Sequence, residues 1–171
     1  MNERRIDYLI VRVAQGDNAA FEQLYFQTKC GVYSFVYSYM GNRADAEDVM
    51  QNTYLKIKLN ADKYTAGTNG RAWILQIAKN LALNELSKRR RAESGGDGEA
   101  EAQSDFPAGS VNDLMQRELS EEERRIVTLH VLWGYKHREI ARMLGCPTGT
   151  VTSKYKRSVE KLKKALKEAE E

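Results

Sequence analysis

Proline is scarce in this sequence, which has only two in 171 residues, Pro107 and Pro147. Because proline interrupts α-helices, its near absence leaves long stretches free to be helical. Apolar residues make up 42% of the chain, and over long stretches they recur with the 3.6-residue period of amphipathic helices. We therefore predict an all-α protein with a packed core, large enough for one large domain or two small ones.

Histidine and cysteine are equally rare, with two residues of each. Cys30 and Cys146 lie far apart in the sequence and fit no metal-ligand spacing. His130 and His137 add too few ligands for a zinc site. We interpret both cysteines as structural thiols and expect neither a metal nor a cofactor.

Long apolar runs are also missing. No segment approaches the length that spans a membrane, and the N-terminal stretch MNERRIDYLIVRV lacks the layout of a signal peptide. These absences predict a cytoplasmic protein without membrane insertion of its own.

The net charge of +3 conceals an uneven distribution of charge. Residues 71–91 include six basic and one acidic residue, and residues 148–167 include seven basic and one acidic. Between them, residues 92–113 (AESGGDGEAEAQSDFPAGSVND) have six acidic and no basic residues and are rich in glycine, serine and alanine, which is typical of a flexible linker. We predict two small helical domains, 1–91 and 114–171, joined by a flexible acidic linker over 92–113, with two separate anion-binding surfaces.

The first domain is expected to begin with two helices. An amphipathic stripe predicts a helix over residues 4–15. Asp17 or Asn18 is suited to cap a second, aromatic-rich helix that ends at Gly41. Asn42 then opens a third helix with acidic residues in its first turns, which the helix dipole favours.

The third helix, roughly residues 43–59, has an imperfect pattern. Its core-facing side is predicted to consist of Ala46, Val49, Met50, Thr53 and Ile57. Leu55 points the other way, beside Asp48 and Gln51, and Glu47 and Tyr54 lie at the margin of this outward face. An outward leucine framed by acid and amide groups suits a protein partner, but single exposed leucines are also common on protein surfaces. The pattern alone leaves both interpretations open.

Residues 60–70, NADKYTAGTNG, form a polar loop in which Tyr64 is predicted to be an exposed aromatic. A fourth helix follows over RAWILQIAKNLALNELSKRRR. Its predicted inward residues are Trp73, Ile74, Ile77, Ala78 and Leu81, and its predicted outward residues are Gln76, Lys79, Asn80, Leu83, Ser87 and Arg90. The helix ends in four consecutive cations, residues 88–91. Because four cations exceed what the helix dipole favours, we interpret them as contacts to phosphate.

The clearest DNA-binding signal is HREIARMLGCPTGTVTSKYKRSV, residues 137–159. Its apolar spacing predicts two helices joined by a tight turn at Gly145, with Pro147 at a first helical position. In the second helix the predicted inward residues are Val151, Tyr155, Val159, Leu162 and Leu166, and the predicted outward residues are Gly149, Ser153, Lys156 and Arg157. A short basic helix of this kind enters the DNA major groove in helix-turn-helix proteins. The alternative is an ordinary αα-hairpin with a solvated basic face.

A further helix is predicted to support this pair. Ser120 and Glu123 form the capping box S-x-x-E at its start, and Gly134 lies near its end. His130 falls on its apolar side together with Ile126. We interpret His130 as a packed core histidine and not as a catalytic one.

Five segments in the same order resemble the small two-domain sigma factors of the extracytoplasmic-function (ECF) group of bacteria. They are GDNAAFEQLY at 16–25, DAEDVMQNTYLKI at 45–57, RAWILQIAKNLALNELSKRRR at 71–91, LSEEERRIVTLHVLWGYKHREIARMLG at 119–145, and PTGTVTSKYKRSVEKL at 147–162. The resemblance covers nearly the whole chain, and the linker falls in the expected place. It implies a promoter-specificity subunit of RNA polymerase that catalyses nothing itself.

The resemblance also implies roles for individual residues. The helix matching 45–57 contacts the polymerase core enzyme in this family, which makes Asp48, Gln51 and Leu55 candidate core contacts. The segments matching the loop and the fourth helix read and open the promoter −10 element, and the candidates there are Lys63, Tyr64, Asn69, Arg71, Gln76, Lys79 and Asn80. The second domain resembles the reader of the −35 element, with candidate contacts at Thr148, Gly149, Thr152, Ser153, Lys156 and Arg157. Family members are commonly held inactive by an anti-sigma factor, which we expect as a further partner besides core enzyme and promoter DNA.

Some residues depart from the family pattern. The family often has a basic residue where Gln76 stands, and Asp and Arg where Asn84 and Ser87 stand. Lys154 replaces a frequent arginine, and Ser158 replaces a frequent small apolar residue. Fewer fixed cations along the fourth helix predict either weaker duplex affinity or an altered −10 preference.

Two other classes of protein differ from a sigma factor in what they require. A stand-alone helix-turn-helix repressor or activator would dimerise on a palindrome without help, whereas a sigma factor is expected to be a monomer that needs core polymerase for tight promoter binding. A small helical hydrolase finds little support, because the sequence has no nucleophile–base constellation and no metal spacing.

Overall fold

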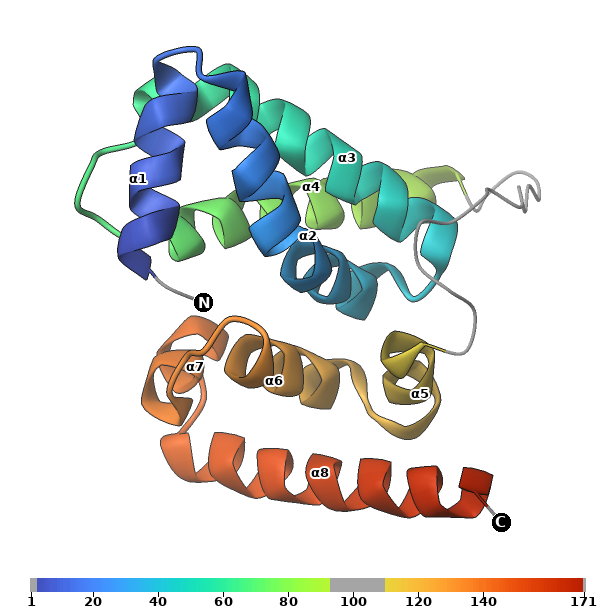
Figure 1. Ribbon diagram of the computed structural model, residues 1–171. Coiled ribbons are helices and arrows are strands. Elements are labelled where there is room, and N and C mark those ends of the chain that lie inside the picture. The colour runs from blue at the N-terminus through green and yellow to red at the C-terminus, as the bar shows by residue number, and fades with distance from the viewer. Residues whose placement is uncertain (1–2, 93–109, 171) are drawn as a thin grey trace. The chain divides into compact units, whose positions relative to one another are not determined.

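The computed structural model describes residues 3–92 and 110–170, and all regular secondary structure in these ranges is helical (Figure 1). The chain divides into an N-terminal unit, up to residue 104, and a C-terminal unit, from residue 105. The prediction of an all-α protein is confirmed. The predicted linker falls largely on residues 93–109, outside the described residues. At its two ends, Ala92 closes one helix, and residues 111–113 belong to the first turn of another.

The N-terminal unit is built around a long helix. Its elements are α1 (Glu3–Ala14), α2 (Asn18–Met40), α3 (Arg43–Asn60), the short 3-10 helix η1 (Ala61–Lys63) and α4 (Gly70–Ala92). Helix α2 packs against α1, α3 and α4, and α4 also packs against α1 and α3 (Figure 1). The apolar stripe of α1 is buried as predicted, because Ile6, Leu9, Ile10 and Val13 all face this core.

Side-chain caps fix where α2 and α3 begin. The Asp17 carboxylate accepts a hydrogen bond from the Ala20 N–H at 3.0 Å, and the Asn42 side-chain oxygen accepts one from the Asp45 N–H at 3.1 Å. These contacts satisfy N–H groups that have no partner within their own helix. The predicted starts of both helices are confirmed, with Asp17 rather than Asn18 as the cap of α2.

The inward face of α3 is buried as predicted, and Leu55 points outward. The prediction that Glu47 and Tyr54 lie at the margin of the outward face is wrong, because both are buried. The Tyr54 hydroxyl lies 2.7 Å from the Thr28 hydroxyl, and Thr28 donates its own hydrogen to a backbone carbonyl of α2. Tyr54 is therefore the donor in this bond, and burial raises its pKa, so the phenol keeps the hydrogen that it donates.

The C-terminal unit consists of α5 (Val111–Glu118), α6 (Glu121–Val131), α7 (His137–Leu144) and α8 (Thr148–Glu170). Helix α8 packs against the other three. The predicted capping box at the start of α6 is confirmed, since the Ser120 N–H donates to the Glu123 carboxylate at 2.9 Å. Helix α5 was not predicted as a separate element. It starts with a similar contact, in which the Ser110 N–H donates to the Asp113 carboxylate at 3.0 Å.

The tight turn predicted at Gly145 joins α7 to α8. Gly145 has a φ of +67°, which a residue without a Cβ adopts readily, and its N–H bonds to the Ala141 carbonyl. Val151 at the start of α8 is buried, but Leu166, also predicted to face inward, is 52% exposed. Leu166 lies near the end of the 23-residue α8, whereas α6 has 11 residues. The last turns of α8 therefore have less protein surface to pack against.

The start of α4 lies very close to α1. A Cβ built on Gly70 would come within 2.6 Å of the Asp7 Oδ1 atom and 2.8 Å of the Ile10 Cδ1 atom. A Cβ at this position would force the side chains of Asp7 and Ile10 to shift. Gly70→Ala should therefore lower the free energy of unfolding of the N-terminal unit by about 1–3 kcal/mol, measured by urea unfolding of the full chain with the two units fitted separately.

Gly149→Ala is the matched control, because a Cβ at Gly149 in α8 meets nothing within 4 Å. Replacing an unhindered helical glycine by alanine should raise the free energy of unfolding of its own unit by about 0.5–1 kcal/mol. Equal effects of the two substitutions would contradict the close approach at Gly70.

Candidate functional sites

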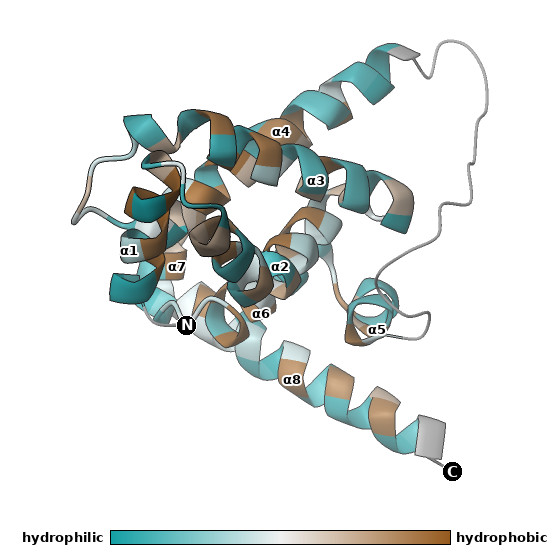
Figure 2. Cartoon of the chain, turned by 45° about the horizontal axis from the view of Figure 1, so that its top comes forward, coloured by the Kyte–Doolittle hydropathy of each residue, from teal (hydrophilic) through white to brown (hydrophobic). Residues whose placement is uncertain are grey.

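The outward face of α8 carries the residues predicted to contact −35 DNA. Thr148, Gly149, Ser153, Lys156 and Arg157 are all exposed, and Thr152 is half-buried. Figure 2 shows apolar and polar residues alternating around α8, as expected of an amphipathic helix. The first turns of α8 therefore present small polar groups, followed one turn later by two cations.

Thr152 joins this face to the supporting helices. Its hydroxyl donates to the Thr148 carbonyl at 3.0 Å and lies 3.1 Å from Nδ1 of His137, the first residue of α7. Because the hydroxyl hydrogen is already used, Nδ1 of His137 is the donor in the second bond. The His137 ring lies next to the His130 ring, with 4.6 Å between the ring centroids. His130 is half-buried and its Nδ1 lies 2.8 Å from the Tyr135 carbonyl, which agrees with its interpretation as a packed histidine.

Two ion pairs hold α8 to α6 on its inner side. Lys154 pairs with Glu122, and the Lys161 Nζ atom lies 2.9 Å from the Glu123 carboxylate. Burial opposes ionisation of Glu123, but its bonds to Ser120 and Lys161 outweigh burial and lower its pKa. Ser158, which departs from the family pattern, is fully buried, and its hydroxyl donates to a carbonyl one turn earlier in α8 at 2.8 Å. The helix itself therefore satisfies this hydroxyl.

The outward face of α3 holds the three predicted core-polymerase contacts. Asp48, Gln51 and Leu55 are exposed, and Leu55 is 55% exposed. Leu59, one turn further along the same face, is 64% exposed and was not singled out in the sequence. Its spacing of four from Leu55 was the signal that could have identified it. Asp48 and Gln51 also line a polar hollow between α3 and α4, to which Glu85 of α4 contributes.

The structure corrects the prediction for Tyr64, which is buried rather than exposed. Its hydroxyl donates to the Asp7 Oδ1 atom of α1 at 2.7 Å, and its ring packs against Trp73 with 5.3 Å between the centroids. Burial and the neighbouring Asp7 carboxylate raise the Tyr64 pKa, so the phenol stays protonated as a donor. Tyr64 therefore anchors the loop between α3 and α4 and does not project from it.

Arg71 and Asn69 also have partners within the protein. Arg71 is only 8% exposed, and its guanidinium lies 3.1 Å from the Glu3 carboxylate of α1. The Asn69 side-chain oxygen accepts a hydrogen bond from the Ala72 N–H at 2.9 Å, and its carbonyl accepts one from the Trp73 N–H. Asn69 is thus the N-cap of α4. The partner of Arg71 could not be recognised from the sequence of the loop, whereas an asparagine just before a predicted helix is a signal for an N-cap.

The other candidates for −10 contacts lie at the surface. Lys63 is exposed at the end of η1, and Gln76 and Asn80 are exposed one turn apart on α4. The Gln76 Nε2 atom donates to the Asn80 Oδ1 atom at 2.8 Å, which orients the two amides relative to each other. Lys79 between them is half-buried. These side chains form a small polar surface on the first half of α4.

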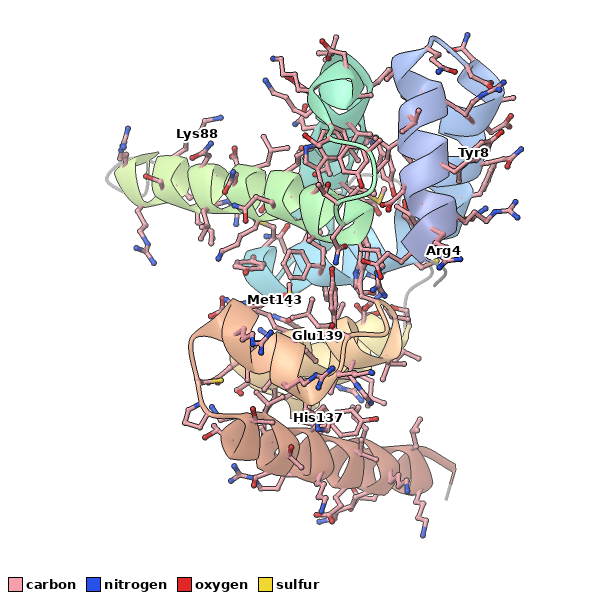
Figure 3. All side chains as sticks on the ribbon, turned by 90° about the vertical axis from the view of Figure 1, so that its left-hand side faces the viewer. Arg4, Tyr8, Lys88, His137, Glu139 and Met143 are labelled. Carbon is pink, nitrogen blue, oxygen red and sulfur yellow. The ribbon has the colours of Figure 1, made fainter. Side chains whose placement is uncertain are left out.

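The basic end of α4 is partly neutralised within the N-terminal unit. Arg89 pairs with Asp45 of α3, and the Lys88 Nζ atom lies 3.3 Å from the Glu85 carboxylate. Figure 3 shows Lys88 near the far end of α4, and Arg90 is exposed there as well. Part of the charge that we predicted to contact phosphate is therefore used in folding.

Among residues 3–92 and 110–170, no three His, Cys, Asp or Glu side chains gather in a group able to hold a metal ion. Within the same ranges, no helix has the length and apolar character needed to cross a membrane.

Comparison with known proteins decides the family. Residues 5–92 match the family model Sigma-70 region 2, and residues 113–162 match the model Sigma-70, region 4. Two relatives, each called ECF RNA polymerase sigma-E factor, come from Salmonella typhimurium and Escherichia coli. Each is 32% identical over 180 residues, covering 94% of both chains. The chain belongs to the ECF sigma factors.

A solved structure shares the fold of this sigma factor. It is the sigma factor RpoE in complex with the anti-sigma factor NepR from Bartonella quintana, with a TM-score of 0.60, 23% identity, and coverage of 86% of this chain and 96% of that chain. As a member of the family, the protein directs RNA polymerase core enzyme to promoters and takes part in transcription initiation. The resemblance noted in the sequence is confirmed at the level of family and function.

His137 gives the C-terminal unit of this sigma factor a dependence on pH. Burial, and to a smaller degree the neighbouring His130, lowers the His137 pKa below its ordinary value of about 6.5. Below about pH 6.5, His137 is therefore more protonated in the unfolded chain than in the folded one. The free energy of unfolding should fall as the pH drops through this range. Urea unfolding at pH 7.5 and at pH 5.5 should show this loss in the C-terminal unit.

His137→Gln is the matched variant, because it removes the titrating ring. The pH slope between 7.5 and 5.5 should be smaller in this variant than in the wild type. The contribution of Glu123 does not interfere, because a carboxylate with a lowered pKa loses its stabilising effect only at more acidic pH. An unchanged slope would show that His137 is not the group that titrates.

Proposed function

We propose that the two units divide the promoter between them. The N-terminal unit binds core polymerase through α3 and captures opened −10 bases, while the C-terminal unit holds the −35 duplex through α8. The observation that carries this proposal is that each unit exposes its own polar surface, on α4 in one and on the first turns of α8 in the other. The protein contributes no catalytic group of its own and acts in the cytoplasm, where the polymerase transcribes.

The exposed face of α8 has the chemistry of a major-groove reader. Thr148, Gly149 and Ser153 at its start are small enough to let the helix approach base edges closely. Lys156 and Arg157, one turn later, supply the positive charge that phosphates require. Thr152 is held between Thr148 and His137, so it approaches DNA in a fixed orientation.

The outward face of α3 supports a protein contact. Leu55 and Leu59 are both more than half exposed and lie one turn apart, which makes an apolar patch rather than a single leucine. Asp48 and Gln51 surround it with polar groups. An apolar centre with a polar rim is the usual anatomy of a protein interface.

The surface of the N-terminal unit that faces −10 DNA is narrower than the sequence predicts. Lys63, Gln76, Lys79 and Asn80 remain available as contacts. Tyr64, Asn69 and Arg71 act instead by holding the loop and the start of α4 in place. An amide pair beside cations suits an unpaired base and the backbone of its strand.

An anti-sigma factor is the third partner that we propose. The sigma factor RpoE that shares this fold was solved with the anti-sigma factor NepR. An inhibitor that covers the leucine patch of α3 would prevent core polymerase from binding. Release of such an inhibitor would then switch on transcription.

Run-off transcription on a genomic library tests the proposed function directly. Core polymerase with the purified protein should produce transcripts whose start sites share two sequence elements, one near −10 and one near −35. Core polymerase alone is the control and should not produce them. Transcripts without a shared −35 element would refute the role of α8.

Leu55→Asp should weaken binding to core polymerase by about tenfold or more, because a charge replaces an apolar contact at the centre of the patch. The fold should be unchanged, because the Leu55 side chain already faces solvent. Binding is measured by titrating labelled protein with core enzyme, and folding by circular dichroism. Leu166→Asp is the matched control, since this leucine is 52% exposed on the other unit. Equal losses in both variants would argue against the patch.

Lys156→Ala should weaken binding to −35 duplex several-fold and reduce its salt dependence, because one phosphate contact is lost. Capture of single-stranded −10 DNA by the holoenzyme should not change. Lys163→Ala is the control, since Lys163 is exposed on the same face of α8 two turns further along. If the Lys156→Ala variant bound both the −35 duplex and the single-stranded −10 DNA less well, the division of roles between the two units would be refuted.

A further inference from the structure

A single oxygen atom of α1 closes the base of the loop between η1 and α4. The Asp7 Oδ1 atom accepts hydrogen bonds from the Tyr64 hydroxyl and from the Gly70 N–H, each at 2.7 Å. Tyr64 is the last residue before the exposed part of the loop, and Gly70 is the first residue of α4. Both ends of the segment 65–69 are therefore held at one point. Figure 1 shows this loop running beside α1.

The contact at Gly70 also caps α4 from another helix. The first N–H groups of a helix have no partner within it, and a carboxylate near them is favoured by the helix dipole. Asp7 satisfies the N–H of Gly70, and the Asn69 side chain satisfies that of Ala72. A side chain at position 70 would collide with Asp7, so glycine is what permits this bond.

The segment between these anchors forms a compact turn. The Thr68 hydroxyl donates to the Thr65 carbonyl at 2.7 Å, and Gly67 between them has a φ of +80°. Residues 65–68 are all exposed. The turn thus presents exposed polar groups, while its base is fixed by the bonds to Asp7 and by the packing of Tyr64 against Trp73.

We infer that Asp7 is a positioning residue for −10 recognition, because it fixes both ends of the loop whose family counterpart reads the −10 element. This inference rests on the proposed function of the N-terminal unit. A loop that is not ordered in advance loses part of its discrimination between bases to the cost of ordering on binding. Asp7 removes this cost by tying both ends of the loop to α1, without touching DNA itself.

The test measures selectivity rather than affinity alone. Holoenzyme made with each variant is incubated with single-stranded DNA randomised over six nucleotides, and bound DNA is sequenced. Asp7→Ala should lower the enrichment of preferred hexamers over scrambled ones by about tenfold, because both hydrogen bonds that hold the ends of the loop are lost. Asp7→Asn keeps an oxygen acceptor and should lose less. Tyr64→Phe keeps the ring against Trp73 but removes one of the two bonds, so it should also lower the enrichment.

Glu22→Gln is the matched control. It makes the same kind of change, from a carboxylate to an amide, at an exposed position on α2 of the same unit. This variant should keep the wild-type enrichment, and all variants should bind core polymerase as the wild type does.

The possible outcomes distinguish the positioning role of Asp7 from −10 recognition by the N-terminal unit. A variant that is merely less folded would bind preferred and scrambled hexamers less well in equal proportion, and this result would overturn the positioning role. Wild-type enrichment retained in both Asp7→Ala and Tyr64→Phe would also overturn it, while leaving −10 recognition by this unit intact. If wild-type holoenzyme itself shows no preference among hexamers, the proposed −10 recognition by the N-terminal unit is refuted, whatever the role of Asp7.

Discussion

Hydrogen bonds to the backbone N–H groups at the helix starts fix where helices of both units begin. An α-helix cannot satisfy its first N–H groups internally, so another group must do so. Asp17 and Asn42 do this for α2 and α3, Ser120 and Glu123 for α6, and the Glu139 carboxylate accepts the N–H of Lys136 at the start of α7. At α4 one of the groups comes from another helix, because Asp7 of α1 binds the Gly70 N–H. The position of α4 thus depends on a contact between distant parts of the chain.

The exposed surfaces follow from this arrangement. With α4 fixed against α1, its amides at positions 76 and 80 and the turn at residues 65–68 are exposed. With α8 fixed by ion pairs to α6, its first turns present small polar residues and two cations. The outward face of α3 carries neither pattern but has two exposed leucines. Three surfaces of different chemistry therefore suit three kinds of contact: an opened strand, a duplex and a protein.

Periodicity in the sequence predicts the helices and most of their buried faces, because amphipathic spacing is a local property. It correctly places Leu55 outward and the helix-turn-helix at residues 137–159. It fails at Tyr64 and Arg71, whose partners Asp7 and Glu3 lie 57 and 68 residues away. No local pattern predicts that a loop tyrosine and a helix-start arginine will meet carboxylates of α1. Helix α5 was missed for another reason, since its first three residues, 111–113, fell within the predicted acidic linker, although Leu114 and Met115 follow Val111 at helical spacing.

We propose that the two units of this sigma factor hold promoter DNA tightly only together with polymerase. The binding of one promoter fragment should be measured with and without core enzyme, and the mass of each complex determined. Nanomolar binding is expected only in the presence of core enzyme, with one copy of the chain per complex. Nanomolar binding of the protein alone, as a dimer on a palindrome, would contradict it.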